Sequence, residues 1–369
     1  MLKENPEIPK TKSASASPDL ISQGFHTQSP TERYPCNHPG WEYLFENPLK
    51  VIMSNRRDFL KTALAGTAAA GLGKLSAAEA PAPAPAGIDR QALGKIGTQV
   101  SLIGLGLGSA FTQPYKEKVE EGQMLLEQAL EKGINYWDTC RGYGPSEEMI
   151  GPVVEKHREK IFLVTKSGGR DYDSLMRDVE TSLKKCKTDH FNIFHMWNLK
   201  AKEDLDRMEK GCFKAVQKLK DEKVIHHYGI TGHSGADVLF NAVKRFHPDA
   251  MMTVFPCTRD DNGKYEDKLL PLAREQKVSV IAMKTVRHAR GADLKGSDLI
   301  RYALSLDGIY CAVVGLDTLA HLNENVEMAT NFAPMTKEEM ADLNRISTRV
   351  LANTQPPWEK PGYQDGALV

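Results

Sequence analysis

The sequence lacks a charge imbalance and any paired-cysteine motif. It has 48 Lys and Arg residues against 48 Asp and Glu residues, so its formal net charge is zero. A neutral chain gives no electrostatic reason to expect a nucleic acid or an anionic membrane as a partner. The six cysteines include no Cys-x-x-Cys pair, which argues against a zinc ribbon and a disulfide-dense scaffold. We expect isolated cysteines such as Cys186 and Cys311 to be small buried hydrophobes.

The sequence also lacks an apolar run long enough to span a bilayer. Residues 62–73 form a weakly apolar Ala/Gly stretch, shorter than the ~20 apolar residues that a transmembrane helix needs. The stretch follows Arg56 and Arg57, a few residues after Met53, which would be a natural start. This arrangement resembles a twin-arginine export signal, with small residues at 76–78 for cleavage. The alternative is an Ala-rich surface helix that happens to follow two arginines.

The composition divides the chain into three parts. Residues 1–52 are rich in Pro, Ser, Thr and Asn without sustained periodicity, which predicts a disordered or untranslated extension. Residues 53–86 comprise the predicted twin-arginine signal peptide and a stiff Pro/Ala linker. Residues 87–369 are the predicted folded part, a barrel with a C-terminal helix and tail. The signal implies recognition by the twin-arginine export machinery, which carries folded proteins, and a periplasmic location.

From residue 87 onward, short β-branched or aromatic runs alternate with amphipathic helical stretches. Runs such as 161–165, 278–283 and 311–315 are apolar throughout, as expected of parallel strands covered on both faces. Eight such units in about 280 residues match an α/β protein of the (β/α)8 TIM barrel type, for which ~250 residues is typical. A doubly wound open sheet is the structural alternative. The runs centre near Ile103, Tyr136, Val164, Phe194, Ile230, Val254, Ile281 and Val313.

Two local motifs have competing interpretations. The stretch "GLGLGSA" at 104–110 partly mimics a dinucleotide fingerprint, but it lacks a third glycine at the required spacing. Residues 113–115, "QPY", would also interrupt the helix that such a fingerprint needs, so we interpret the stretch as the end of the first barrel strand. Ser146 precedes two glutamates, and we expect it to cap the helix that follows.

Four titratable side chains lie at the ends of three consecutive predicted strands. Asp138, Lys166 and His195 end the second, third and fourth runs, and Tyr143 lies on the loop beyond Asp138. Singly, each has a plain structural role: a turn cap, a lysine reaching solvent, a core histidine or a loop tyrosine. In a barrel, however, the carboxyl ends of the strands meet at one mouth, where catalytic residues collect. We therefore expect the four side chains to form one site.

Their combination predicts proton transfer to or from an oxygen atom. A free tyrosine has a pKa of ~10 and is a poor proton donor near neutrality. A lysine cation ~4 Å from the phenol oxygen, at an effective dielectric of ~20, would stabilise tyrosinate by up to ~4 kcal/mol. We therefore predict that Lys166 lowers the pKa of Tyr143, by as much as ~3 units. Asp138 would keep the buried Lys166 charged, and His195 would hold a substrate oxygen by a hydrogen bond.

The segments that contain these residues resemble the signature segments of the aldo-keto reductases. They read "GINYWDTCRGYGPSEEMIG" from 133, "IFLVTKSG" from 161 and "DHFNIFHMWN" from 189, with a similar opening from 91 and a similar cofactor-binding close at 315–326. The resemblance implies a (β/α)8 barrel in which hydride passes between the nicotinamide of NAD(P) and a carbonyl carbon. Tyr143 would be the general acid, tuned by Lys166 and Asp138, and His195 would orient the carbonyl.

The cofactor side departs from the family pattern in several places. Gly315 and His321 stand where NADP-specific members carry Lys and Arg for the 2′-phosphate, which weakens selection for NADP over NAD. Arg287 or Arg290 would compensate, or would lie on an ordinary solvated loop. Thr231-Gly232 replaces the Ser-Asn pair that often contacts the nicotinamide amide. The resemblance implies cofactor-binding roles for Thr231, Lys284 (toward the pyrophosphate), Gly315, Thr318, Glu324 and Asn325.

The leading interpretation is an NAD(P)-dependent oxidoreductase acting on a small-molecule carbonyl compound or sugar. Because free nicotinamide cofactor is scarce outside the cytoplasm, we expect the nucleotide to be tightly bound before export. The alternative is a non-catalytic nucleotide-sensing or partner-binding barrel, which would have no need of a tuned phenol. We expect no metal site, since metal-ligand carboxylates are not evident, and no iron–sulfur cluster. Specificity would lie in loops and in the tail at 355–363, with Trp197 and Trp358 as candidate pocket residues.

Overall fold

The structure, a computed structural model, describes residues 88–258 and 264–366. Eight strands form a closed barrel, because β10 pairs in parallel with both β3 and β9 and so joins the two ends of the sheet. This confirms the predicted (β/α)8 barrel and excludes the open sheet. In barrel order the strands are β10 (Ile309–Gly315), β3 (Ile103–Gly106), β4 (Tyr136–Asp138), β5 (Phe162–Ser167), β6 (Phe191–Leu199), β7 (Ile225–Gly232), β8 (Ala250–Val254) and β9 (Ser279–Met283).

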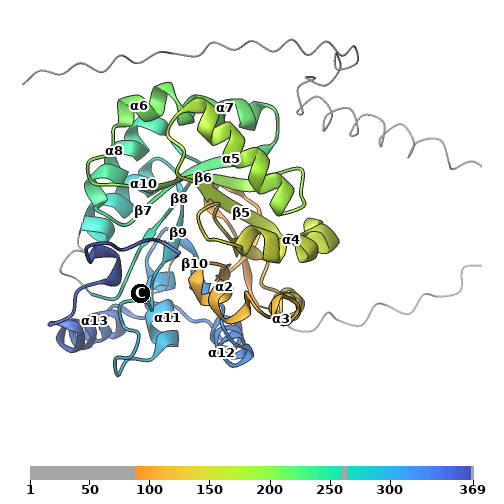
Figure 1. The fold of residues 1–369 in the computed structure, drawn as a ribbon. Helices are drawn as coiled ribbons and strands as arrows, with labels where there is room; N and C mark the ends of the chain where they lie inside the picture. Colours follow the sequence, from red (N-terminus) through yellow and green to blue (C-terminus); the bar gives the residue numbers. More distant parts are fainter. Residues whose placement is uncertain (1–87, 259–263, 367–369) are drawn as a thin grey trace, which may run out of the picture. The chain divides into compact units, whose positions relative to one another are not determined.

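Helices surround the strands (Figure 1). Within the described ranges no helix is long and apolar enough to cross a membrane. The α-helices are α2 (Ser109–Tyr115), α3 (Val119–Glu131), α4 (Ser146–His157), α5 (Tyr172–Lys185), α6 (Leu205–Lys210), α7 (Cys212–Asp221), α8 (Ala236–Phe246), α10 (Leu270–Glu275), α11 (Gly296–Ser305), α12 (Leu319–Thr330) and α13 (Lys337–Leu351). The shorter elements are η1 (Gly94–Ile96), η2 (Arg158–Lys160), η3 (Tyr265–Leu269) and η4 (Pro357–Glu359).

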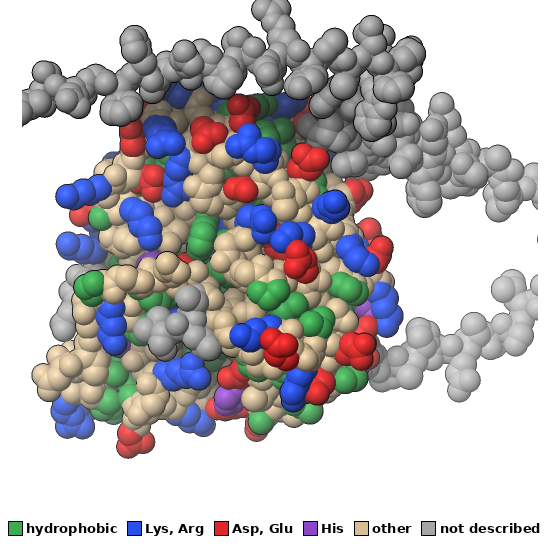
Figure 2. All heavy atoms as spheres, viewed as in Figure 1, with side chains coloured by type: hydrophobic (Ala, Val, Ile, Leu, Met, Phe, Trp, Pro, Cys, Tyr) green, Lys and Arg blue, Asp and Glu red, His purple; other side chains and the backbone are tan. Residues whose placement is uncertain are grey.

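The barrel strands are buried on both faces, which explains why several of them read as unbroken apolar runs. Every residue of β5, β8 and β9 is buried. The surrounding helices are amphipathic: α7 buries Val216 and Leu219, while Lys218 pairs with Glu222 at the surface. Figure 2 shows Lys and Arg side chains interspersed with Asp and Glu over the face in view, in keeping with the zero net charge.

A short hairpin, which the sequence analysis did not predict, covers the N-terminal ends of barrel strands. Its strands β1 (Arg90–Ala92) and β2 (Gln99–Ser101) pair in an antiparallel ladder. Leu93 is fully buried, and its carbonyl oxygen accepts a hydrogen bond from the Ser279 hydroxyl at 3.0 Å. Ser279 begins β9, so the hairpin lies at the end of the barrel opposite the mouth where β9 finishes.

Two local predictions were wrong. Ser146 does not cap α4; its hydroxyl instead donates to the carbonyl oxygen of Leu107 at 2.6 Å and contacts the Thr139 hydroxyl at 2.7 Å. A buried hydroxyl therefore joins two loops at the barrel mouth. Residues 113–115 were expected to interrupt any helix after the first barrel strand. A helix nevertheless follows β3: the seven-residue α2 begins at Ser109 and includes Pro114 near its end. Strand β3 itself ends at Gly106, as predicted.

The polypeptide after α13 returns to the barrel. In Figure 1 this dark blue segment, residues 352–366, runs from α13 back toward the strands. Trp358 is buried within it and packs edge-on against His288, with ring centroids 6.1 Å apart. The predicted extension at 1–52 and the predicted signal and linker at 53–86 lie outside the described residues, so those boundaries stay predictions.

Candidate active site

The predicted pair of Asp138 and Lys166 lies at the mouth of the barrel. Neighbouring strands β4 and β5 place them together, and the Lys166 ammonium lies 2.7 and 2.6 Å from the two Asp138 carboxylate oxygens. It also donates to the carbonyl oxygen of Thr139 at 2.8 Å. The Lys166 side chain is only 1% exposed. A charge this deeply buried requires a counter-charge and hydrogen bonds, and Asp138 and Thr139 supply both.

Tyr143 lies beside this pair on the loop between β4 and α4. The Lys166 ammonium is 4.9 Å from the centroid of the Tyr143 ring. On another side, the ring packs at 87° to Trp197, with centroids 6.1 Å apart. The phenol is thus held between a cation and an aromatic wall, as the convergence of the strand ends predicted.

The prediction that Lys166 lowers the pKa of Tyr143 was wrong. Burial, followed by the carboxylates of Asp365 and Asp138, raises the pKa of Tyr143 well above its ordinary value. Besides burial, two features of the site explain why the predicted lowering does not occur. The Lys166 ammonium directs its hydrogen bonds to Asp138 and Thr139, and Asp365 brings a negative charge that the sequence analysis did not place here.

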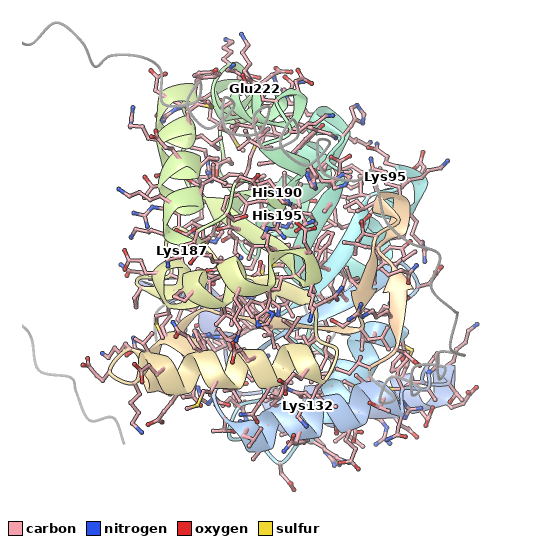
Figure 3. The ribbon with its side chains drawn as sticks, turned by 90° about the vertical axis from the view of Figure 1, so that its right-hand side faces the viewer. Lys95, Lys132, Lys187, His190, His195 and Glu222 are labelled. Carbon is pink, nitrogen blue, oxygen red and sulfur yellow. The ribbon has the colours of Figure 1, made fainter. Side chains whose placement is uncertain are left out.

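His195 completes the predicted set from β6, where it pairs in register with Lys166 of β5. It lies among the strands in the interior (Figure 3), fully buried. Burial, and then the Lys166 charge, hold its pKa well below the ordinary range, so the imidazole is neutral at pH 7. Neither ring nitrogen has a hydrogen-bond partner among the described residues. Because buried polar atoms are normally satisfied, this indicates a place for a ligand oxygen.

The ring of His195 is positioned by close contact with Gly229 of β7. A Cβ atom at position 229 would lie 2.2 Å from the His195 Nδ1 atom and 2.6 Å from the carbonyl oxygen of Ala250. Only glycine leaves room for the imidazole in this position. This contact was not identified from the sequence, since a glycine inside a strand often marks a bulge or a tight bend instead.

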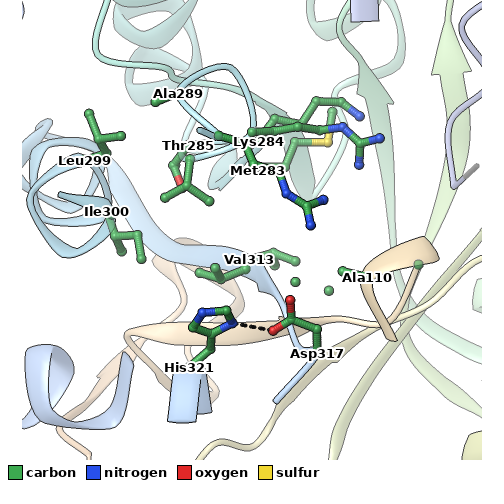
Figure 4. A pocket seen from close by; sticks show the side chains of 18 of the residues that line it. Ala110, Met283, Lys284, Thr285, Ala289, Leu299, Ile300, Val313, Asp317 and His321 are labelled. Atoms are coloured by element: carbon green, nitrogen blue, oxygen red, sulfur yellow. Dashed lines mark hydrogen bonds and ion pairs between the residues drawn. The ribbon is translucent and has the colours of Figure 1, made fainter. Parts of the chain in front are cut away.

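A cavity of about 430 Å³ is lined by two of the four catalytic candidates and by several predicted cofactor residues, whereas Lys166 and His195 do not line it. Asp138 and Tyr143 line one part of it, and Arg287 and Arg290 also line it. Figure 4 shows Met283, Lys284 and Thr285 on one side of the cavity, across from Val313, Asp317 and His321. Four of the predicted cofactor residues line this cavity: Lys284, Gly315, Glu324 and Asn325.

The other two predicted cofactor residues do not line it. The Thr231 hydroxyl is buried and accepts a hydrogen bond from the Asn198 amide at 2.9 Å. Thr318 is the N-cap of α12, where its hydroxyl accepts from the His321 amide at 3.2 Å. Both threonines support the walls of the site, and direct cofactor contacts for them stay predictions.

Lys284 is committed to a partner that the sequence analysis missed. Its ammonium forms an ion pair with the carboxylate of Asp365 and lies 3.1 Å from the Tyr363 hydroxyl. Both partners belong to the segment after α13. No pattern in the sequence links positions 284 and 365; the tail was singled out only as a source of specificity, and Asp365 falls just beyond the stretch 355–363.

Comparison with known proteins assigns the family. Residues 102–298 match the model of the aldo/keto reductase family, and residues 53–73 match the signal sequence of the twin-arginine translocation pathway. The chain therefore belongs to the aldo/keto reductase family of oxidoreductases and bears a twin-arginine-type signal. The family membership supports general NAD(P)-dependent oxidoreduction and a small-molecule substrate.

Individual relatives agree with this assignment. The chain is 25% identical over 305 residues to "Uncharacterized oxidoreductase YqkF" of Bacillus subtilis, covering 69% of this chain and 95% of that protein. It is 25% identical over 315 residues to L-galactose dehydrogenase of Arabidopsis thaliana, covering 73% and 97%. The fold matches the holo form of an aldo-keto reductase from Bacillus halodurans with a TM-score of 0.60 and 22% identity, covering 70% and 96%.

Proposed function

We propose that the protein transfers a hydride between the nicotinamide of NAD(P) and a carbonyl or alcohol carbon, with Tyr143 as the general acid or base. One observation supports this most directly. His195, a neutral imidazole without a hydrogen-bond partner in the described part of the chain, pairs in register with Lys166, whose ammonium lies against the Tyr143 ring. A donor for the carbonyl oxygen and a donor of the proton therefore both lie beside Lys166.

Each residue has a distinct role in this proposal. His195 donates a hydrogen bond to the carbonyl oxygen and fixes its position. The raised pKa of Tyr143 keeps the phenol protonated at neutral pH, which is the form that delivers a proton to the developing alkoxide. Lys166 stabilises the tyrosinate that results, and Asp138 keeps Lys166 charged. Nicotinamide, when bound, supplies the hydride chemistry.

The described residues fit a nicotinamide dinucleotide. The cavity extends from Tyr143 to Glu324, and Arg287 and Arg290 line it with cationic side chains that suit phosphate groups. His321, which stands where NADP-specific members carry a cation, contacts the Asp317 carboxylate at 2.5 Å. This carboxylate gives no attraction for a 2′-phosphate, so any preference for NADP would come from the two arginines.

The replacement Tyr143→Phe tests the catalytic proposal. Loss of the general acid should lower kcat by about 10²- to 10⁴-fold, while the Kd for nucleotide stays unchanged. Steady-state kinetics and a fluorescence titration measure the two quantities. Tyr136→Phe is the matched control, because the buried Tyr136 hydroxyl has no hydrogen-bond partner among the described residues. Wild-type turnover in Tyr143→Phe would remove the proposed role of Tyr143, whereas nucleotide binding without any turnover in the wild type would favour the non-catalytic nucleotide-binding alternative.

We also propose that the protein is exported to the periplasm by the twin-arginine machinery with its nucleotide bound. The matching signal at 53–73 supports export, and that route carries folded proteins. A denatured sample of the mature exported protein, analysed by chromatography and ultraviolet absorbance, should yield about one equivalent of NAD or NADP and identify which. A nucleotide-free sample would contradict retention of the cofactor.

A further inference from the structure

A carboxylate from the segment after α13 lies inside the active-site cavity. Asp365 is 5% exposed at its side chain and contacts four groups. Its Oδ1 atom accepts from the Lys284 ammonium and, at 3.0 Å, from the Tyr363 hydroxyl. Its Oδ2 atom lies 3.4 Å from the indole nitrogen of Trp197 and 3.3 Å from Nε2 of His233.

Three of these four contacts belong to the barrel itself. Trp197 is in β6, His233 follows the end of β7, and Lys284 follows the end of β9. The His233 and Lys284 side chains are 1% and 9% exposed. Lys284 also has a φ of 59°, in the left-handed region that non-glycine residues rarely adopt. Such backbone strain is concentrated at ligand-binding sites, and it adds to the evidence that the barrel is built to place this ammonium here.

The segment that provides Asp365 is attached less firmly than the barrel residues that hold it. Residues 359–362 and Gln364 are exposed, and Tyr363 is only partly buried. Asp365 is therefore the main buried polar anchor of this stretch. Tyr363 adds a hydrogen bond to Lys284 and an edge-on contact with His233, so the largely exposed stretch is held mainly by two side chains. Such a segment can detach without disturbing the strands.

The same segment covers the catalytic tyrosine. A Cβ atom on Gly366 would lie 2.3 Å from Cδ1 of Tyr143, so the Gly366 backbone packs directly on the phenol ring. Asp365 and Gly366 line the cavity that Tyr143 and Asp138 also line. A substrate that approaches Tyr143 from this side must therefore displace the segment.

We propose that Lys284, His233 and Trp197 form a carboxylate subsite of the substrate pocket, which Asp365 occupies until a carbonyl substrate bearing its own carboxylate replaces it. This inference rests on the proposed oxidoreductase function and names its substrate class, and it assigns Lys284 to the substrate instead of to the cofactor pyrophosphate that the family resemblance implies. A carboxylate substrate exchanges one ion pair with Lys284 for another. A neutral substrate that took the place of Asp365 would itself cover the Lys284 ammonium and leave it buried and unpaired, which is strongly unfavourable. The exchange therefore selects for anionic substrates.

Binding of propionate to the nucleotide-loaded protein, measured by calorimetry, tests the subsite without turnover. Asp365→Ala should bind propionate at least tenfold more tightly than the wild type, because the internal competitor is gone, and propionamide should show no such gain. Adding Lys284→Met, or His233→Phe if that double variant does not fold, should remove the gain. Gln364→Ala, an exposed neighbour, is the matched control and should behave as the wild type. Equal affinities for propionate and propionamide in Asp365→Ala would show that Asp365 only anchors its own segment.

Turnover distinguishes failure of the subsite from failure of the proposed function. Succinic semialdehyde and butyraldehyde differ by a terminal carboxylate, and the wild type should prefer the former at least tenfold in kcat/KM. Lys284→Arg should keep this preference, and Lys284→Met should lose it. Turnover of both aldehydes without preference would overturn the subsite and leave the oxidoreductase intact. Selective propionate binding without turnover of either would support the subsite and count against the proposed reaction.

Discussion

Two lysine–carboxylate pairs lie at the mouth of the barrel, and they are built differently. Asp138 and Lys166 come from adjacent strands, and both side chains are fixed within the barrel wall. Lys284 follows another strand, but its partner Asp365 comes from a segment without regular structure. Both carboxylates are almost completely buried. We call Asp138–Lys166 the permanent pair, because both residues belong to the barrel. We call Lys284–Asp365 the releasable pair, because Asp365 belongs to a segment that can detach.

The pKa values of the two carboxylates also shift in opposite directions. Burial raises the pKa of Asp138 and outweighs the opposing effect of Lys166. Burial also acts to raise the pKa of Asp365, but the Lys284 ammonium and His233 hold it well below its ordinary value. Asp365 in turn is the largest charge that raises the pKa of Tyr143, ahead of Asp138. The carboxylate of the releasable pair thus raises the pKa of Tyr143 more than the carboxylate of the permanent pair does.

Breaking the permanent pair should have the larger effect on stability. Lys166→Met leaves Asp138 buried without its cation, and we expect the free energy of unfolding at pH 7 to fall by about 3–5 kcal/mol. Urea denaturation followed by circular dichroism measures the change. A protonated Asp138 needs no counter-charge, so the loss should shrink as the pH falls.

The double replacement Lys166→Met with Asp138→Leu is the control for this prediction. Removing both charges avoids the unpaired carboxylate, so the double variant should recover much of the lost stability. If the free energy of unfolding of Lys166→Met alone lies within about 1 kcal/mol of the wild-type value, the cost of burying an unpaired Asp138 carboxylate is smaller than we expect.

The two pairs also mark where sequence reasoning succeeds. Asp138 ends β4 and Lys166 lies one residue before the end of β5, as expected, but His195 lies inside β6, which continues to Leu199. The parallel order of the barrel still makes these consecutive strands neighbours and aligns His195 with Lys166. Three of the four catalytic candidates could thus be brought together from the order of the strands, and Tyr143 from its place on the loop beyond Asp138. The fold followed from the same pattern of apolar runs and helical stretches.

The second pair could not be predicted, because no periodicity relates a loop residue to an irregular segment 81 positions later. Burial is the largest cause of the raised pKa of Tyr143, and the omitted Asp365 adds the largest charge effect in the same direction, so the predicted direction of the shift was wrong. The local contacts of hydroxyl groups could not be predicted for a related reason. Ser146 and Thr231 bond to groups that tertiary packing brings near them, and Thr318 caps a helix whose start was not predicted.

The position of His195, whose strand lies next to that of Lys166, can be tested through Gly229. Gly229→Ala places a Cβ atom 2.2 Å from the His195 Nδ1 atom, so the imidazole or the β7 backbone must move. We expect an overpacking cost of about 1–3 kcal/mol in unfolding free energy, with a fall in kcat because His195 no longer meets the carbonyl oxygen. Gly296→Ala, where a Cβ atom would meet only an ordinary contact at 3.7 Å, is the stability control. Wild-type kcat in Gly229→Ala would show that the placement of His195 is not critical.

Breaking the releasable pair should have the smallest effect on the barrel. Asp365→Asn should lower the free energy of unfolding at pH 7 by at most about 1 kcal/mol, because the segment can detach and leave the barrel folded. The pKa of Asp365 is depressed in the folded chain, so the stability it contributes is present above the ordinary value of ~3.9 and is lost as the pH falls through the depressed value. The difference between wild type and variant in urea titrations should therefore narrow below about pH 4. Asp342→Asn, on the exposed face of α13, is the surface control and should leave the free energy of unfolding at pH 7 near the wild-type value. A loss as large as that of Lys166→Met would mean that the segment is as integral to the fold as the strands, and that Asp365 is not a releasable occupant.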